Sequence, residues 1–89
     1  MAGVSHNDTL VLYGHDECGL CDRLERMIGP HLLSGNLKLV KKNIRDTPDL
    51  ARRYGNRIPV LTCNGRVLAE GNPSPQQVLD ALKTIAPDI

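Results

Sequence analysis

Aromatic side chains are scarce in this chain of 89 residues, which has no tryptophan, no phenylalanine and two tyrosines, Tyr13 and Tyr54. Proteins that bind single-stranded nucleic acid stack the bases on aromatic side chains, so this scarcity argues against that function. The hydrophobic core must be aliphatic, and a chain of this length buries enough surface for one core only. We therefore expect a single domain over residues 1–89, in which residues 1–8 are flexible.

Strong net charge, long apolar runs and targeting signals are also absent. The 11 Lys and Arg residues nearly balance the 10 Asp and Glu residues, which gives a net charge of +1. A short basic strip, which we interpret as solvated, consists of Lys38, Lys41, Lys42 and Arg45. No apolar stretch approaches the roughly 18 residues of a membrane span, and the N-terminus shows no export or transit signal. We therefore expect a cytoplasmic protein that binds neither nucleic acid nor membranes.

Cysteines are present in an odd number, three, which does not fit a secreted disulfide framework. In a reducing compartment, a Cys-x-x-Cys pair such as Cys18 and Cys21 indicates redox chemistry or half of a metal site. Zinc needs four ligands, usually from two such pairs, and the remaining candidates form no second pair: Cys63, His6, His15 and His31. We therefore expect no metal and no organic cofactor. A purely structural pair of buried thiols is the weaker alternative, because charged residues precede it.

Hydrophobic periodicity predicts three elements in the first half of the chain. A run of β-formers over 9–13 is typical of a strand buried on both faces. An apolar stripe at helical spacing follows the cysteine pair, and Gly29-Pro30 is expected to kink or end this helix. The stripe consists of Leu20, Leu24, Met27, Ile28 and Leu32. The opposite, solvent-facing side of this helix is predicted to carry Asp22, Arg23, Glu25 and Arg26. A second strand is predicted over 37–44.

Local start and stop signals predict the elements of the second half. Thr47-Pro48 begins a short helix that Gly55 ends. Asn64-Gly65 favours a type I′ turn between strands over 60–63 and 66–70. Ser74-Pro75, with a glutamine positioned to complete a capping box, begins a C-terminal helix.

The resulting order is β-α-β-α-β-β-α. The first two strands are separated by a helix, which implies a parallel pair, and the last two form an antiparallel hairpin. We therefore expect a four-stranded mixed sheet with helices on both faces. Cys63 alternates with Leu61 in the third predicted strand, so we interpret it as a buried core residue.

The cysteine pair lies between a predicted strand and a predicted helix. The amide groups and the positive end of that helix point at the sulfur of Cys18, which favours its thiolate form. Cys21 follows one turn later on the same side, close enough to attack a mixed disulfide formed on Cys18. Asp16 and Glu17 oppose the thiolate by roughly 1 kcal/mol each, while His15 adds a positive charge when it is protonated. The thiolate of Cys18 is therefore expected to be only mildly favoured.

Two segments resemble a known family. The pattern 13–21, Tyr-Gly-His-Asp-Glu-Cys-Gly-Leu-Cys, and the pattern 54–61, Tyr-Gly-Asn-Arg-Ile-Pro-Val-Leu, are similar to the thioredoxin superfamily and, within it, to small glutaredoxin-like proteins. The resemblance covers roughly 9–85. It implies a thioredoxin-like fold of the glutaredoxin type, and a Cys-Gly-Leu-Cys redox motif.

The resemblance also implies roles for individual residues. Cys18 would be the nucleophile and Cys21 the resolving thiol, and the two would form a redox disulfide. The Ile58-Pro59 bond would be cis, with the backbone of Ile58 offered to the bound peptide or glutathione. His15 stands where glutathione-using relatives commonly have a lysine, and with Ile58 and Pro59 it is expected to position the substrate.

Two functions remain open at this point. The first is a thiol-disulfide oxidoreductase, expected to be a monomer, that reduces protein or small-molecule disulfides with glutathione or a flavin reductase as its electron donor. The second is a thioredoxin-fold binding or adaptor domain with little turnover. The acidic residues before Cys18 favour the second function, as does Gly19-Leu20 in place of the Pro-Tyr common in glutaredoxins.

Overall fold

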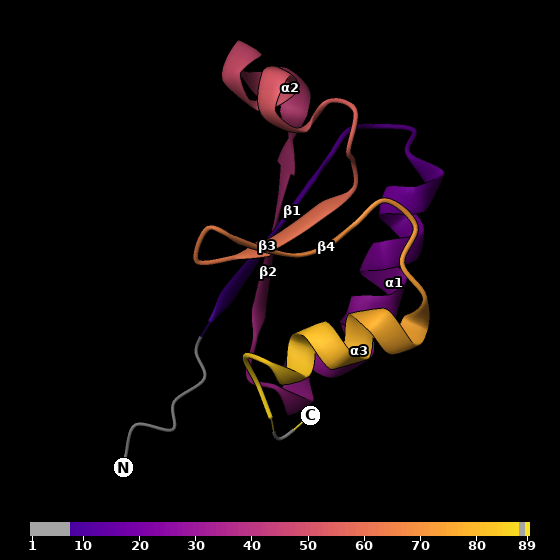
Figure 1. Ribbon diagram of the computed structural model, residues 1–89, viewed down its shortest axis with the longest axis vertical. Helices are drawn as coiled ribbons and strands as arrows, with labels where there is room; N and C mark the ends of the chain where they lie inside the picture. The colour runs from indigo at the N-terminus through magenta and orange to yellow at the C-terminus, as the bar shows by residue number, and fades with distance from the viewer. Residues whose placement is uncertain (1–7, 88) are drawn as a thin grey trace.

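The computed structural model of the protein describes residues 8–87 and 89. The expected flexibility of residues 1–8 therefore concerns a segment that lies outside the described residues, except for Asp8, whose carbonyl oxygen accepts a hydrogen bond from Lys38 N (3.1 Å). The predicted element order is confirmed, with one additional 3-10 helix (Figure 1). The elements are β1 (Thr9–Gly14), α1 (Gly19–Ser34), β2 (Lys38–Asn43), η1 (Ile44–Asp46), α2 (Pro48–Tyr54), β3 (Val60–Cys63), β4 (Arg66–Glu70) and α3 (Pro75–Lys83).

The four strands form one mixed sheet, as predicted, and their order across it is β2-β1-β3-β4. β1 pairs with β2 in parallel, with Leu10 opposite Leu39, and pairs with β3 in antiparallel fashion, with Leu12 opposite Leu61. β3 and β4 form the predicted hairpin. Asn64 and Gly65 have φ angles of 53° and 81°, which fits the type I′ turn expected of this dipeptide.

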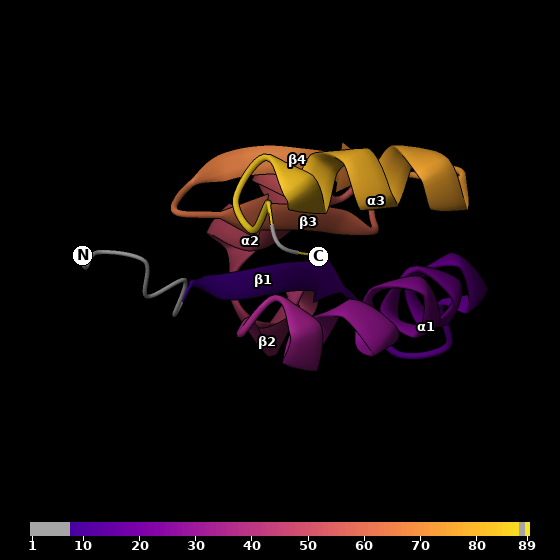
Figure 2. The ribbon, with the colours of Figure 1, turned by 90° about the horizontal axis from the view of Figure 1, so that it is seen from below.

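One face of the sheet is covered by α1 and α3, which lie side by side away from α2 (Figures 1 and 2). Alternate residues of β1 and β3 point into this face, where they meet apolar side chains from both helices. The buried residues of this main core are Leu10, Leu12, Leu24, Ile28, Leu37, Leu61, Cys63, Val78, Leu82 and Ala86.

The opposite face is covered near one end only, by η1 and α2. A second, smaller core contains Ile44, Tyr54 and Val60, and the ring of Tyr13 stacks on that of Tyr54 with 4.3 Å between centroids. Helices therefore lie on both faces, as predicted. The expectation that β1 is buried on both faces is wrong, because Val11 and Tyr13 are only half-buried where the short second layer leaves the sheet partly open.

Helix α1 departs from its predicted pattern at both ends. Leu20, expected on the buried stripe, is 43% exposed, and the neighbouring Cys21 is buried instead. The helix also continues through Gly29 and Pro30 to Ser34. Leu32, beyond the proline, packs against the main core, and this burial offsets the hydrogen bond that Pro30 cannot donate.

The predicted caps of the two later helices are confirmed. Thr47 Oγ1 accepts a hydrogen bond from Leu50 N (3.1 Å) at the start of α2. Ser74 and Gln77 form a reciprocal capping box at the start of α3. β2 is shorter than predicted, because Ile44 already belongs to η1. No helix among the described residues is long and apolar enough to cross a membrane.

Candidate active site

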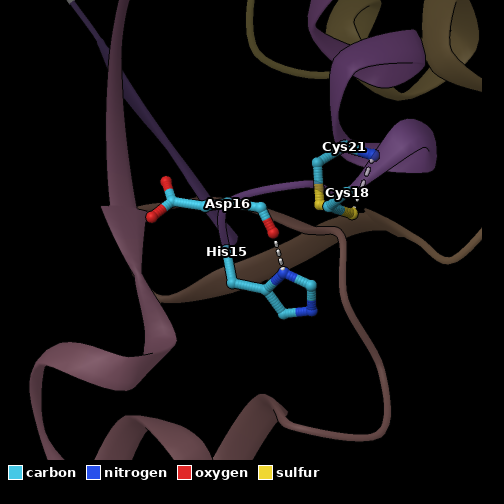
Figure 3. The surroundings of a disulfide bond; sticks show 4 residues. All are labelled: His15, Asp16, Cys18 and Cys21. Carbon is cyan, nitrogen blue, oxygen red and sulfur yellow. Dashed lines mark hydrogen bonds between the residues drawn. A yellow bond between two sulfur atoms is a disulfide. The ribbon is translucent and has the colours of Figure 1, made fainter.

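Cys18 and Cys21 form a disulfide at the N-terminus of α1, with their Cα atoms 5.2 Å apart (Figure 3). Cys18 is the N-cap residue, and its backbone oxygen accepts a hydrogen bond from Asp22 N (3.1 Å). Its sulfur accepts a hydrogen bond from Cys21 N at 3.1 Å. A side chain at this position receives the free amide groups and the positive end of the helix dipole, so the structure places the sulfur of Cys18 where a thiolate is stabilised.

The two sulfur-bearing residues differ in exposure. Cys18 is half-buried, whereas Cys21 is 8% exposed and lies behind it. The Cys21 sulfur packs so closely on β1 that a Cβ atom added to Gly14 would lie 2.6 Å from it. Cys18 is therefore the more accessible of the two residues, and Cys21 is shielded behind it.

The loop between β1 and α1 presents a charged surface beside the disulfide. Glu17 has a φ of 60°, an uncommon conformation for a residue other than glycine and one often found at functional sites. His15 Nδ1 donates a hydrogen bond to the backbone oxygen of Asp16 (2.6 Å), and the carboxylate of Asp16 points away from the disulfide (Figure 3). Asp16 therefore opposes a thiolate on Cys18 less than its place in the sequence predicts.

The Ile58-Pro59 peptide bond is cis, which confirms what the resemblance implied. Pro59 is buried and Ile58 is half-buried. Val60, the next residue, pairs with Tyr13 at the end of β1, so this bond lies at the same end of the sheet as the loop that leads to Cys18. The oxygen of Pro59 accepts a hydrogen bond from Gly71 N (2.8 Å).

Arg23, which sequence reasoning placed on the solvent face of α1, instead fastens that helix to the loop after β4. Its Nη1 atom donates to Asn72 Oδ1 (2.7 Å) and to the backbone oxygen of Pro73 (2.9 Å). The partners are 49 and 50 residues away in sequence, so no local pattern signals the contact. Through Gly71 and Arg23, this loop links the cis-proline segment to the helix that carries the cysteines.

A second arginine lies just before the cis-proline. Arg57 donates to Glu70 Oε2 from Nε (3.0 Å) and Nη2 (2.7 Å), and its guanidinium lies over the ring of Tyr54, 5.7 Å from the centroid. Both partners of the Arg57–Glu70 ion pair are partly exposed, so the pair contributes little stability by itself.

Burial and the neighbouring Tyr54 raise the pKa of Tyr13, so this phenol stays neutral at physiological pH.

A cavity of about 320 Å³ lies behind the disulfide, on the side of β2. Cys21 lines it, together with Gly14 and His15. Glu25 of α1 and Lys41 of β2 also line it and form an ion pair, with Lys41 Nζ 3.2 Å from Glu25 Oε1. The interpretation of Lys41 as a solvated surface charge was therefore incomplete, because β2 carries this residue to the same face as α1.

Cys63 lies in the main core, as predicted. It is a free cysteine, 3% exposed, and burial raises the pKa of its thiol above the usual value. Among residues 8–87 and 89, no three or more His, Cys, Asp or Glu side chains are grouped so that they could hold a metal ion.

Comparisons with known proteins agree with this geometry. The family model described as glutaredoxin-like domain (DUF836) matches residues 9–83. The solution NMR structure of protein Ne2328 from Nitrosomonas europaea is 26% identical, with a TM-score of 0.71 over 84% of this chain and 89% of that chain. A mutant thioredoxin from Halobacterium salinarum NRC-1 is 25% identical, with a TM-score of 0.64 over 92% and 78%.

Oxidised thioredoxin from Plasmodium falciparum, at 13% identity, shares the fold, with a TM-score of 0.66 over 93% of this chain and 86% of that chain. The search of curated protein sequences gave no significant match.

Proposed function

The chain belongs to the glutaredoxin-like domain family, and from this we propose that it is a thiol-disulfide oxidoreductase that reduces protein or small-molecule disulfides through Cys18 and Cys21. The observation that carries the proposal is the hydrogen bond from Cys21 N to the sulfur of Cys18 at the start of α1. This arrangement stabilises a thiolate on the more accessible of two cysteines that can bond to each other.

The proposed reaction transfers two electrons from the dithiol to the substrate. The Cys18 thiolate attacks one sulfur of the substrate disulfide, and the other sulfur leaves as a thiolate that takes up a proton. The Cys21 thiol then loses its proton and attacks the Cys18 sulfur of the mixed disulfide. The second substrate sulfur leaves as a thiol, and the protein is left with the Cys18–Cys21 disulfide seen here.

Substrate positioning is assigned to Ile58, Pro59 and His15. Among the described residues, the backbone N–H and C=O groups of Ile58 have no backbone partner, so they are free to pair with an extended peptide or with glutathione. His15 lies in the loop before Cys18 and lines the cavity behind the disulfide.

We propose further that the protein works as a cytoplasmic monomer without metal or organic cofactor, and that it binds neither nucleic acid nor membranes. Its electron donor is glutathione or a flavin-dependent reductase. Incubating the oxidised protein with glutathione and its reductase, or with a thioredoxin reductase, and then counting free thiols, identifies the donor.

The function is tested by turnover of a disulfide substrate in a coupled assay. The wild type and Cys63→Ala should turn over, Cys18→Ser should be inactive, and Cys21→Ser should accumulate a mixed disulfide visible by mass spectrometry. A wild-type protein without turnover, or an active Cys18→Ser variant, would contradict the enzymatic function.

A binding or adaptor domain is the second candidate, favoured by Glu17, which directly precedes Cys18, and by Gly19-Leu20 in place of the Pro-Tyr common in glutaredoxins. Each carboxylate that faces the sulfur opposes the thiolate on which turnover depends. An adaptor would retain a bound partner when both cysteines are replaced by serine. An oxidoreductase would lose its covalent partners in the same variant.

A further inference from the structure

The cavity behind the disulfide opens on Cys21 and not on Cys18. Cys21 is among its lining residues, whereas Cys18 is not. Gly14, whose missing side chain makes room for the Cys21 sulfur, lines the same cavity. Groups that line this space therefore have access to Cys21, the resolving cysteine of the proposed function.

The resolving step of the proposed function needs a proton acceptor for Cys21. Its amide already donates to the sulfur of Cys18, so the start of the helix stabilises a charge on Cys18 and not on Cys21. Burial disfavours a charged thiolate, and Cys21 is only 8% exposed. Strand β1 contributes Leu12 and Gly14 to the cavity, and neither side chain can accept a proton.

Glu25 is the carboxylate best placed to accept that proton. It follows Cys21 by four residues, and side chains at this spacing on a helix are neighbours, with Cβ atoms about 5–6 Å apart. The side chain of Glu25 is 38% exposed. Among the described residues, Glu25 is the acid of this cavity that forms an ion pair, with Lys41. The other titratable groups that line the cavity come from the β1–α1 loop, from α1 and from β2: His15, Asp16, Glu17, Asp22 and Lys42.

Two of these other acids are less suitable. The carboxylate of Asp16 points away from the disulfide (Figure 3). Asp22 directly follows Cys21 and is exposed, and adjacent residues do not face each other on a helix.

We propose that Glu25, held in the cavity by Lys41, accepts the proton of Cys21 during resolution of the mixed disulfide. The proton moves from the Cys21 sulfur to the Glu25 carboxylate, directly or through one water molecule. The Cys21 sulfur then bonds to the Cys18 sulfur, the bond from Cys18 to the substrate breaks, and the substrate sulfur leaves with the electron pair. The departing thiolate takes up a proton, so Glu25 returns to its ionised form and no further reactant is needed.

This inference rests on the proposed function, and a single-turnover experiment separates the two. The reduced protein is mixed with an excess of an aromatic disulfide that releases a coloured thiolate. Attack by Cys18 releases the first equivalent, and resolution by Cys21 releases the second. Absence of the first phase in the wild type would contradict the proposed function itself.

Glu25→Gln should leave the first phase unchanged and slow the second by about a hundredfold at pH 7, a typical effect of losing a general base. Raising the pH to about 9 should restore the second phase, because hydroxide can then deprotonate the thiol. Lys41→Gln should slow the second phase less, since the carboxylate remains. Asp49→Asn, which removes an ion-paired carboxylate on α2, should change neither phase.

The direction of the effect distinguishes proton transfer from simple charge repulsion. If Glu25 only repelled a thiolate on Cys21, Glu25→Gln would speed the second phase at every pH. Either a faster second phase or an unchanged one would overturn the inference. Glu25→Asp keeps the carboxylate and should recover part of the rate. Thermal unfolding of each variant identifies any loss that comes from misfolding, and in that case the Glu25→Asp and Lys41→Gln rates decide the question.

Discussion

Cys18 and Cys63 lie in the same small protein but in opposite surroundings. Cys18 is half-buried at the start of a helix, with charged residues before it and an amide hydrogen bond to its sulfur. Cys63 is 3% exposed at the end of a central strand, surrounded by the aliphatic residues of the main core. The same side chain therefore lies at an accessible helix start at one site and acts as a small apolar group in the core at the other.

The difference lies in the groups that the backbone places around each sulfur. At the helix start, the backbone supplies donors that stabilise a negative charge. In the core, burial raises the pKa of the Cys63 thiol, the negative charge of Asp8 adds to this effect, and Arg66 opposes it. Cys21 lies between these extremes, buried but adjacent to a charged cavity.

The largest expected effect is on alkylation. After reduction, iodoacetamide should modify Cys18 at least about a thousandfold faster than Cys63, because Cys63 reacts only when the protein unfolds, which costs at least about 5 kcal/mol in a typical domain. Mass spectrometry of timed samples measures both rates. In concentrated urea the cysteines should react alike, and similar rates in the native protein would show that Cys63 is accessible.

Replacement of Cys63 should affect stability and not redox chemistry. Cys63→Ser buries a hydroxyl group in the apolar core and should lower the free energy of unfolding by about 2 kcal/mol. Cys63→Ala should cost less, because it leaves a small cavity but no polar group. Urea denaturation measures both variants. A change in the reduction potential of the Cys18–Cys21 disulfide would contradict the separation of the two regions.

Gly14→Ala should shift the dithiol–disulfide equilibrium by about tenfold toward the dithiol, or about 30 mV. In the disulfide, the Cys21 sulfur is tied where the new Cβ would lie 2.6 Å away. In the dithiol, the side chain can rotate away. Equilibration with glutathione buffers measures the shift.

Gly29→Ala is the matched control for this variant, because a Cβ atom at Gly29 meets nothing within 4 Å. It should leave the equilibrium unchanged and stabilise the helix by about 0.5–1 kcal/mol. Equal reduction potentials for the two variants would show that the Cys21 sulfur has room beside Gly14.

The smallest effect is on the pH dependence of stability. The pKa values of Cys63 and Tyr13 are both raised in the folded protein, chiefly by burial. The contribution of these two groups to the free energy of unfolding is therefore fully present below their pKa values in the unfolded chain, about 8.5 for cysteine and 10 for tyrosine. It is lost as the pH rises through their higher pKa values in the folded protein. Urea denaturation between about pH 8 and 10.5 should show falling stability, with a shallower fall in Cys63→Ala. Identical slopes would contradict a contribution from Cys63.

Elements with local signals could be predicted from the sequence. The turn at Asn64-Gly65 and the caps at Thr47 and Ser74 are confirmed, because each depends on hydrogen bonds and backbone angles within a few residues. The end of α1 could not be predicted, because its continuation past Pro30 depends on packing of Leu32 against the main core, which residues far apart in the sequence form.

The candidate site also has features that the sequence predicts and features that depend on contacts between distant residues. The positions of Cys18 and Cys21 followed from a strand-helix boundary, and the cis bond before Pro59 from a resemblance. Their roles, and that of His15, stay predictions. Arg23 and Glu25 were interpreted as solvent-facing, because a helical pattern shows which face is polar but not what that face meets.

The order of the elements, the Cys-x-x-Cys pair and its place at a helix start follow from the order of residues, since periodicity, capping and spacing are local properties of the chain. The shielding of Cys21, the clamp formed by Arg23 and the Glu25–Lys41 pair depend on the folded protein. Lys41 is 16 residues from Glu25, and Asn72 is 49 residues from Arg23. Only pairing of the strands and packing of α1 on the sheet bring such partners within hydrogen-bonding distance.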